Sequence, residues 1–200
     1  MYDTFAAASS LTVRYGPPTF TVAVALLGTL AAHWDVLVQF SLPKVTETVY
    51  HNNPFPYSVR IAELIKEKTS KEDRIAIFGN EPQFLFYSHR KSATPFIYLF
   101  SLVEEQPLAQ QFRLEMMRQV ESASPKVLVF TRVQSESGKR SNEWEALDDW
   151  FFNFANLQYT LTARFEYLNI NDTTLITDPV LLKKKPTHLF WISIYEKRIE

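Results

Sequence analysis

The chain has 200 residues, with 21 basic and 22 acidic side chains and a formal net charge of -1, so we expect no nucleic-acid partner. It contains no cysteine, which excludes disulfides, thiolate metal sites and cysteine nucleophiles. Its four glycines, at positions 16, 28, 79 and 138, allow neither a dinucleotide-binding fingerprint nor a phosphate-binding P-loop.

The most apolar part of the chain lies near its beginning. Residues 1–16 form an N-terminal segment without a clear pattern, and two prolines then open a run that continues to Phe40. A helix over residues 19–40 would be roughly 33 Å long, against a hydrocarbon thickness of about 30 Å. We therefore expect a transmembrane helix over residues 17–40, with Asp35 at the membrane interface, where a charge costs little. A buried helix of a soluble protein and a signal-like segment are the alternatives.

A connector then leads into a domain of mixed composition. Three prolines in residues 41–57 predict an extended connector rather than a helix. Ser58 can cap a short amphipathic helix that ends at Lys68, because the apolar residues between them have helical spacing. We expect residues 58–200 to form one soluble α/β domain.

Two short apolar runs predict strands that are buried on both faces of a parallel sheet. They are residues 75–78, closed by Gly79, and residues 126–131. The aromatic residues 96–102 predict a further strand between them. Two helices complete this half of the domain, one starting at residue 104 and one starting at residue 142, where apolar side chains recur at helical spacing.

The last third of the chain has the pattern of antiparallel strands. Residues 159–167 alternate apolar and polar side chains, which is typical of a half-exposed edge strand. Residues 173–177 and 188–195 predict a hairpin-like end. The complete pattern predicts a three-layer Rossmann-like α/β domain whose mixed sheet is parallel at its centre and antiparallel at its C-terminal edge.

One ligand-binding site can be predicted. Ligands of open α/β sheets collect at the carboxyl ends of strands, which points to the turn after the first strand and to the basic, hydroxyl-rich loop that follows it. That loop could hold a phosphate or pyrophosphate, although a plain basic loop or a lipid-headgroup contact explains it as well. The polar residues 134–141 should face the same side. The candidate residues are Asn80, Glu81, Arg90, Lys91, Ser92 and Thr94.

No pattern in the sequence indicates catalysis. The four histidines stand alone, neighbouring carboxylates such as Glu104 and Glu105 do not share a helix face, and no serine is flanked by glycines. We expect no catalytic residue, no metal site and no cofactor.

The order of several short motifs resembles that of a known family. An apolar helix is followed by Tyr50-His51-Asn52-Asn53-Pro54-Phe55, by Asp73-Arg74-Ile75, by Gly79-Asn80-Glu81-Pro82-Gln83, by Phe84-Leu85-Phe86-Tyr87 and by the loop of residues 90–94. From about residue 17 to the end, this arrangement resembles the carboxyl-terminal part of bacterial GT-C membrane glycosyltransferases, the group related to protein mannosyltransferases and aminoarabinose transferases.

The resemblance implies transfer of a sugar from a polyprenyl-phosphate donor by a many-helix membrane domain with acidic catalytic residues in an early extracytoplasmic loop. Those parts are not in this sequence, so no catalytic residue carries over. The chain would be the last membrane helix and a non-catalytic accessory domain, with Met1 an internal start or the sequence a fragment.

The resemblance also implies a location and partners. The location would be the inner membrane, with the soluble domain on the extracytoplasmic, periplasmic side. The implied partners are membrane lipid, the upstream membrane domain of the same enzyme or a partner, and a polyprenyl-phosphate sugar or its acceptor. Two other interpretations stay open: a single-pass, membrane-anchored binding module without enzymatic activity, and a soluble enzyme, which would need a pocket with perturbed titratable groups.

Overall fold

The computed structural model describes residues 3–50, 53–132, 142–169, 172–188 and 190–198. The first elements are α1 (Asp3–Ala32), a π-helical turn (Asp35–Gln39), α2 (Leu42–Tyr50) and a 3-10 turn (Phe55–Tyr57). The helices that follow are α3 (Ser58–Glu67), α4 (Gln83–Ser88), α5 (Phe100–Val103), α6 (Ala109–Ala123), α7 (Asn142–Gln158) and α8 (Pro179–Leu182). The strands are β1 (Arg74–Phe78), β2 (Lys91–Ser92), β3 (Val127–Arg132), β4 (Tyr159–Asn169), β5 (Asp172–Ile176) and β6 (Phe190–Lys197).

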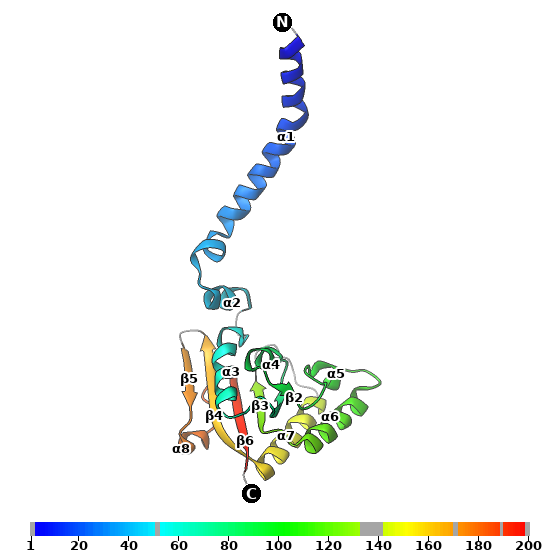
Figure 1. Cartoon of the computed structure of the whole chain (residues 1–200), viewed down its shortest axis with the longest axis vertical. Coiled ribbons are helices and arrows are strands. Elements are labelled where there is room, and N and C mark those ends of the chain that lie inside the picture. The colour runs from blue at the N-terminus through cyan, green and yellow to red at the C-terminus, as the bar shows by residue number, and fades with distance from the viewer. Residues whose placement is uncertain (1–2, 51–52, 133–141, 170–171, 189, 199–200) are drawn as a thin grey trace.

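The strands form one mixed sheet of six strands in the order β2-β1-β3-β6-β4-β5 (Figure 1). β1 is parallel to both β2 and β3, whereas β6 is antiparallel to β3 and β4, and β4 is antiparallel to β5. The predicted α/β class and the mixed sheet are therefore confirmed. The parallel strands fill one half of the sheet rather than only its centre.

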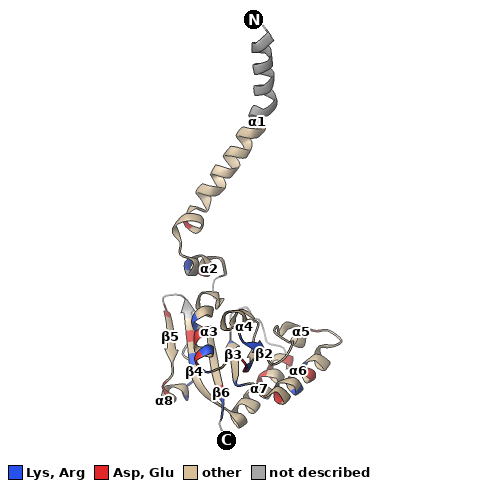
Figure 2. Ribbon diagram, in the orientation of Figure 1, with Lys and Arg blue, Asp and Glu red and all other residues tan. Residues whose placement is uncertain are grey.

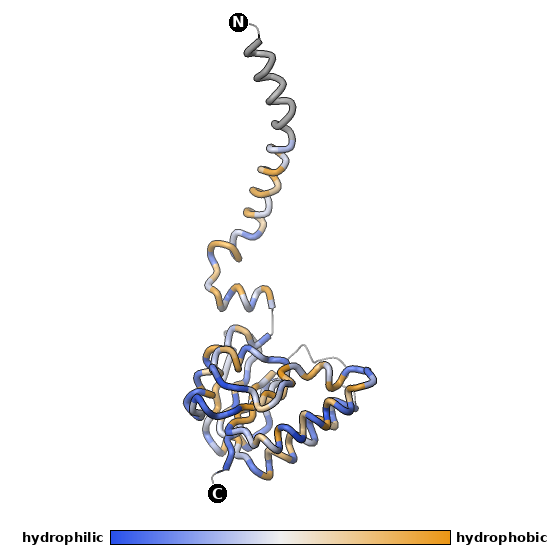
Figure 3. The backbone as a smooth tube through the Cα atoms, turned by 45° about the vertical axis from the view of Figure 1, so that its right-hand side comes forward, coloured by the Kyte–Doolittle hydropathy of each residue, from blue (hydrophilic) through white to orange (hydrophobic). Residues whose placement is uncertain are grey.

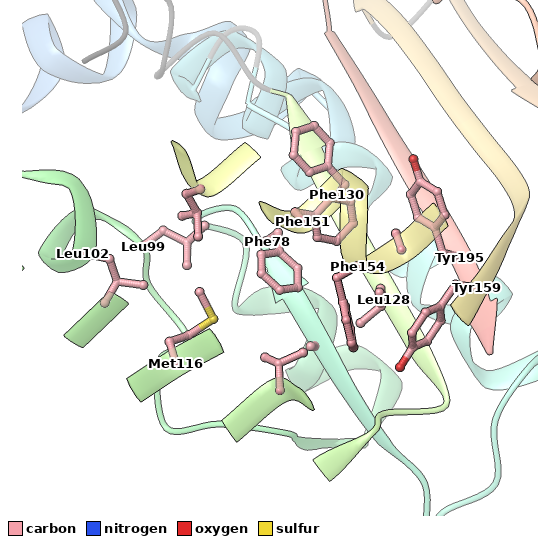
Figure 4. Packing of buried hydrophobic residues seen from close by; sticks show 14 of the residues in the cluster. Phe78, Leu99, Leu102, Met116, Leu128, Phe130, Phe151, Phe154, Tyr159 and Tyr195 are labelled. Carbon is pink, nitrogen blue, oxygen red and sulfur yellow. The ribbon is translucent and has the colours of Figure 1, made fainter. Parts of the chain in front are cut away.

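Helices pack against the sheet through two separate apolar clusters. Alternate residues of β1 divide between them: Ile75 and Ile77 pack with α3 and α4, while Ala76 and Phe78 pack with α5, α6 and α7. In the second cluster the ring of Phe151 lies 4.5 Å from that of Phe78 (Figure 4). Because both faces are covered, the apolar runs of β1 and β3 are continuous, as the sequence predicted for buried parallel strands.

A β-bulge in β4 sends its apolar side chains to two different faces. The register with β6 shifts between Leu161 and Ala163. Tyr159 therefore packs in the cluster of α7, whereas Ala163 and Phe165 pack in the cluster of α3. An extra residue in one strand reverses the alternation beyond it. The alternating apolar residues 159–167 therefore form one strand, but their side chains are buried on both faces of the sheet.

Three of the strand predictions are wrong. Residues 96–102 form a loop and the start of α5, and the parallel partner on that side of β1 is the two-residue strand β2. β4 is not an edge strand, because it lies between β6 and β5. Residues 173–177 and 188–195 do not pair with each other, since β4 separates β5 from β6.

Two helix predictions also need correction. The helix expected from residue 104 starts at Ala109, because the backbone of Glu104 is extended after α5. Residues 41–57 are not an extended connector, since they include α2. The first of their three prolines lies in the first turn of α2, where a missing N–H group costs nothing, and the other two follow the helix.

The N-terminal helix stands apart from the domain as a long rod (Figure 1). The expected unbroken helix over residues 17–40 is wrong in its bounds: α1 begins at Asp3 and ends at Ala32, and a π-helical turn follows. In that turn Phe40 N donates to Asp35 O at 2.8 Å, a bond that spans five residues. Within the described part of the chain, no helix combines the length and the apolar character needed to cross a membrane.

Candidate functional site

The carboxyl ends of β1 and β3 form the edge at which the order of the strands reverses. From β1 the chain passes to β2 on one side, and from β2 it returns across β1 to β3 on the other side. Ligands of open α/β sheets bind at such a reversal. Gly79, Asn80 and Glu81 follow β1 there, and Thr131 and Arg132 end β3. We call this border of the sheet the carboxyl edge.

Gly79 is required by the close approach of the two strands. Its φ is 158°, and a Cβ atom at this position would lie 1.7 Å from Thr131 Oγ1. The Thr131 hydroxyl donates to Phe78 O at 3.4 Å, so it is held against β1. No side chain larger than hydrogen fits at Gly79 unless Thr131 moves.

The next two residues are buried polar groups. Asn80 Oδ1 accepts a hydrogen bond from Leu99 N at 2.8 Å, which fixes the loop before α5 to the carboxyl edge. Glu81 is only 2% exposed and accepts a hydrogen bond from Gln83 Nε2 at 2.5 Å. Burial raises the pKa of the Glu81 carboxyl group to about 7, against the opposing effect of the Gln83 hydrogen bond. Glu81 can therefore gain or lose a proton close to neutral pH.

The end of β3 adds a charged pair to this edge. Arg132 Nη1 lies 3.7 Å from Asp148 Oδ2 on α7, and its guanidinium lies 5.2 Å from the centroid of the Trp191 ring. The hollow beneath the pair, lined by apolar groups such as Phe78 and Trp144, has no room for even a water molecule. Pockets for small ligands usually occupy about 300–1,000 Å³. A ligand would therefore have to lie on the edge rather than in this hollow.

The predicted basic loop lies at the other end of β1. Lys91 pairs with Arg74, the first residue of β1, and Ser92 pairs with the second. Arg90 donates to Thr69 Oγ1 and Thr69 O, both at 2.8 Å, and also to a carbonyl of α4. The guanidinium therefore holds the turn after α3. The expectation that this loop adjoins Gly79 and its neighbours is wrong for its basic residues, because β2 begins opposite the start of β1.

The remaining predicted residues are held by local hydrogen bonds. Ser92 O accepts from Arg74 Nη1 at 2.8 Å, and Thr94 Oγ1 accepts from Phe96 N at 3.2 Å. The structure thus keeps Asn80 and Glu81 together and separates them from Arg90 and Lys91. Residues 134–141, which were expected to face the same side as Glu81, lie outside the described residues.

An apolar groove lies beside the carboxyl edge, between α2, the 3-10 turn, α3 and α4. Its volume is about 480 Å³. The sequence analysis missed it because it expected residues 41–57 to be extended. The groove is lined by Leu42, Val45, Thr46, Tyr50, Phe55, Pro56, Val59 and Tyr87.

Exposed apolar side chains continue from the groove along the carboxyl edge. Phe86 on α4 is 70% exposed, and the loop that Asn80 holds presents two further large side chains to solvent. Charged residues are found on α6, and also on α2 and α3 (Figure 2). We call this set the apolar rim; its members are Leu42, Val49, Tyr50, Phe55, Val59, Phe86, Tyr87, Ile97, Tyr98 and Phe100.

The sequence analysis also missed a buried ionic cluster on β4. Glu166, which is fully buried, accepts from Arg164 Nε at 2.7 Å, from the Thr187 backbone at 2.7 Å and from the Thr187 hydroxyl at 2.6 Å. Burial alone would raise the pKa of Glu166, but the hydrogen bonds from Thr187 and His188 lower it to about 2. Arg164 also donates to the carbonyls of Leu182 and Lys184, so the cluster fastens α8 to the sheet.

His188 extends the cluster toward solvent. Its Nδ1 lies 3.3 Å from Glu166 Oε2 and its Nε2 lies 3.2 Å from Asp172 Oδ1. Burial lowers the pKa of His188, but the two carboxylates outweigh it and raise the pKa above its ordinary value. Within the described ranges, no group of three or more histidine, aspartate or glutamate side chains is placed to hold a metal ion.

The comparisons with known proteins found no similar protein. No protein-family model, curated protein or solved structure matches the chain. The resemblance to GT-C glycosyltransferases therefore rests on the sequence motifs alone and stays a prediction.

Proposed function

We propose that this chain is a membrane-associated, non-catalytic accessory domain of a bacterial GT-C glycosyltransferase that transfers a sugar from a polyprenyl-phosphate donor. The observation that supports membrane association is the apolar surface of α1. Phe20, Leu26 and Leu27 are 71%, 66% and 65% exposed, respectively, and residues 18–32 carry no charge (Figure 3).

A helix that is apolar on all sides needs an apolar environment around it. The exposed apolar positions 20, 22, 24, 26, 27 and 30 span about 200° of the circumference of α1, because successive residues turn by about 100°. The rest of the circumference carries small, uncharged residues such as Ala25 and Gly28. The domain does not supply that environment, since α1 stands apart from it (Figure 1). Lipid, or the membrane part of the same enzyme, would supply it.

The proposed place of the domain is the extracytoplasmic side of the inner membrane, as the resemblance implies. In this position the domain would lie next to the donor or the acceptor without reacting with either. The proposed fold type is Rossmann-like with three layers, supported by the order β2-β1-β3 and by the helices packed on both faces of these strands.

The alternative is a self-contained, membrane-anchored binding module. It is favoured by the buried polar groups at the carboxyl edge, where Asn80 and Glu81 lie beside the reversal of strand order. Both proposals require membrane association, but they differ in what precedes the chain in the genome.

Two experiments test the proposals. The first is cell fractionation followed by alkaline carbonate extraction, comparing the native chain with a variant carrying Leu26→Gln, Leu27→Gln and Leu30→Gln. The native chain should stay with the membranes and the variant should be released; a native chain released by carbonate would contradict both proposals. Alkaline phosphatase fused to the carboxyl terminus should be active if the domain is extracytoplasmic.

The second experiment reads the genomic DNA upstream of the codon for Met1. An open frame encoding many apolar segments supports the glycosyltransferase proposal. A ribosome-binding site directly before that codon, with no apolar segment upstream, supports the anchored module instead.

A further inference from the structure

We infer that the carboxyl edge of the sheet lies against the surface of a lipid bilayer, with the apolar rim in the headgroup region and the groove beside α2 open to the hydrocarbon. This inference rests on the proposed membrane association and adds the orientation of the domain. It also specifies the partner as lipid.

The path of the chain places the rim and α1 at the same end of the molecule. α3 precedes β1 and leads from the 3-10 turn to the turn at residues 69–73, from which β1 runs back toward Gly79. The 3-10 turn and α2 therefore lie at the carboxyl edge, and α1 leaves from there (Figure 1). Only Phe40 and Ser41 separate the π-helical turn from α2. Nine residues, 33–41, therefore separate the end of α1 from the first residue of the groove.

The side chains at this end are of the kinds that favour a membrane interface. Tyr50, Tyr87 and Tyr98 are 54%, 40% and 50% exposed, and Trp34 lies on the other side of the short link to α2. Aromatic residues with one polar group are enriched where hydrocarbon meets water. The charge on α2 is internally neutralised, because Lys44 Nζ lies 2.8 Å from Glu47 Oε2.

The apolar surface runs from α1 to the apolar rim, which favours lipid over a partner helix or a second copy of the chain. A protein partner would cover one stripe of α1, whereas the exposed apolar positions span about 200° of its circumference and residues 18–32 carry no charge on any side. A bilayer is a continuous apolar partner, so the same lipid that covers α1 can extend past Ser41 to Phe55 and Phe86. The opposite edge of the sheet, with Lys91 and Arg74, would then face away from the membrane.

The orientation restricts what can reach Asn80 and Glu81. A ligand at the carboxyl edge would have to approach along the membrane surface, as the head of an amphiphile does. A wholly water-soluble ligand would meet the rim and the bilayer in its path.

The absence of cysteine from the sequence makes a site-specific test possible. Phe86→Cys and Leu157→Cys place a single thiol at two exposed apolar positions, and each is labelled with a fluorophore whose emission rises in an apolar environment. Leu157 is 75% exposed and lies near the opposite edge of the sheet. Two residues after it, Tyr159 pairs with Lys197, and the neighbouring Glu196 pairs with Val127, the first residue of β3. The full chain is added to vesicles of phosphatidylethanolamine and phosphatidylglycerol, and flotation measures binding.

The expected result is flotation of both variants, with an increase in emission of several-fold at position 86 and none at position 157. Flotation with no change at position 86, or with equal changes at both positions, would overturn the orientation while leaving membrane association intact. No flotation of either variant would overturn the inference together with the proposed function. A position 86 label that responds equally without vesicles would show contact with another protein chain.

Discussion

Removing the carboxylate of Glu166 should be the most destabilising single truncation in the ionic cluster. In Glu166→Ala the guanidinium of Arg164, 5% exposed, stays buried without its counter-ion, and the backbone N–H groups of Thr187 and His188 lose their acceptor. Breaking a buried ion pair by removing one partner costs about 3–5 kcal/mol. With a urea m-value of about 2 kcal/mol/M, the unfolding midpoint should fall by about 1.5–2.5 M.

The assay is urea unfolding followed by circular dichroism, with a matched pair on the surface as control. Glu115 and Arg118 form an exposed pair on α6 with a distance of 2.7 Å, and Glu115→Ala should leave the midpoint essentially unchanged. If Glu166→Ala does not fold, the double variant Arg164→Met, Glu166→Leu should recover a cooperative transition, because it leaves no buried charge. Equal midpoint shifts for Glu166→Ala and Glu115→Ala would refute the reasoning.

Three further results are expected. Gly79→Ala should lower the free energy of unfolding by about 1–3 kcal/mol because its Cβ meets Thr131, and Thr131→Ala in the same chain should return part of that loss in urea unfolding. Arg90→Ala should cost about 1.5–3 kcal/mol in the same assay through its lost charged hydrogen bonds, and an unchanged midpoint would show that Arg90 is free for a ligand instead. Stability should fall as pH rises from 4.5 to about 7, because folded Glu81 keeps its proton in that range while the unfolded chain loses it. It should fall further above pH 6.5 as folded His188 deprotonates; Glu81→Gln and His188→Gln should each remove their own part of the slope, and unchanged slopes would contradict the assignment.

Local patterns predicted the strands that are buried on both faces and failed where tertiary contacts decide the structure. β1 and β3 were each found from four consecutive apolar residues, Ile75–Phe78 and Val127–Phe130. β2 was missed because two residues carry no periodicity, and its position depends on the register with Arg74. Residues 96–102 have strand composition, but Asn80 binds the backbone of Leu99 and holds them as a loop.

The candidate site could be predicted only in part for the same reason. Asn80 and Glu81 follow directly from the end of a recognisable strand, and the structure places them at the reversal of strand order. The separation of Arg90 from them depends on where β2 pairs, which no local pattern contains. The burial of Glu166 was equally hidden: charges at alternate positions of a strand indicate a solvent-exposed face, and only the position of α8 over β4 reverses that conclusion.

The π-helical turn between α1 and α2 sets the rotation of the α/β domain about the axis of α1. One residue more or less in an α-helix swivels everything beyond it by about 100°. Deleting Val38, an exposed residue of this turn, would convert the five-residue repeat toward an ordinary helical one. The chain beyond would then present a different flank to any neighbour fixed around α1, with every contact inside the body preserved.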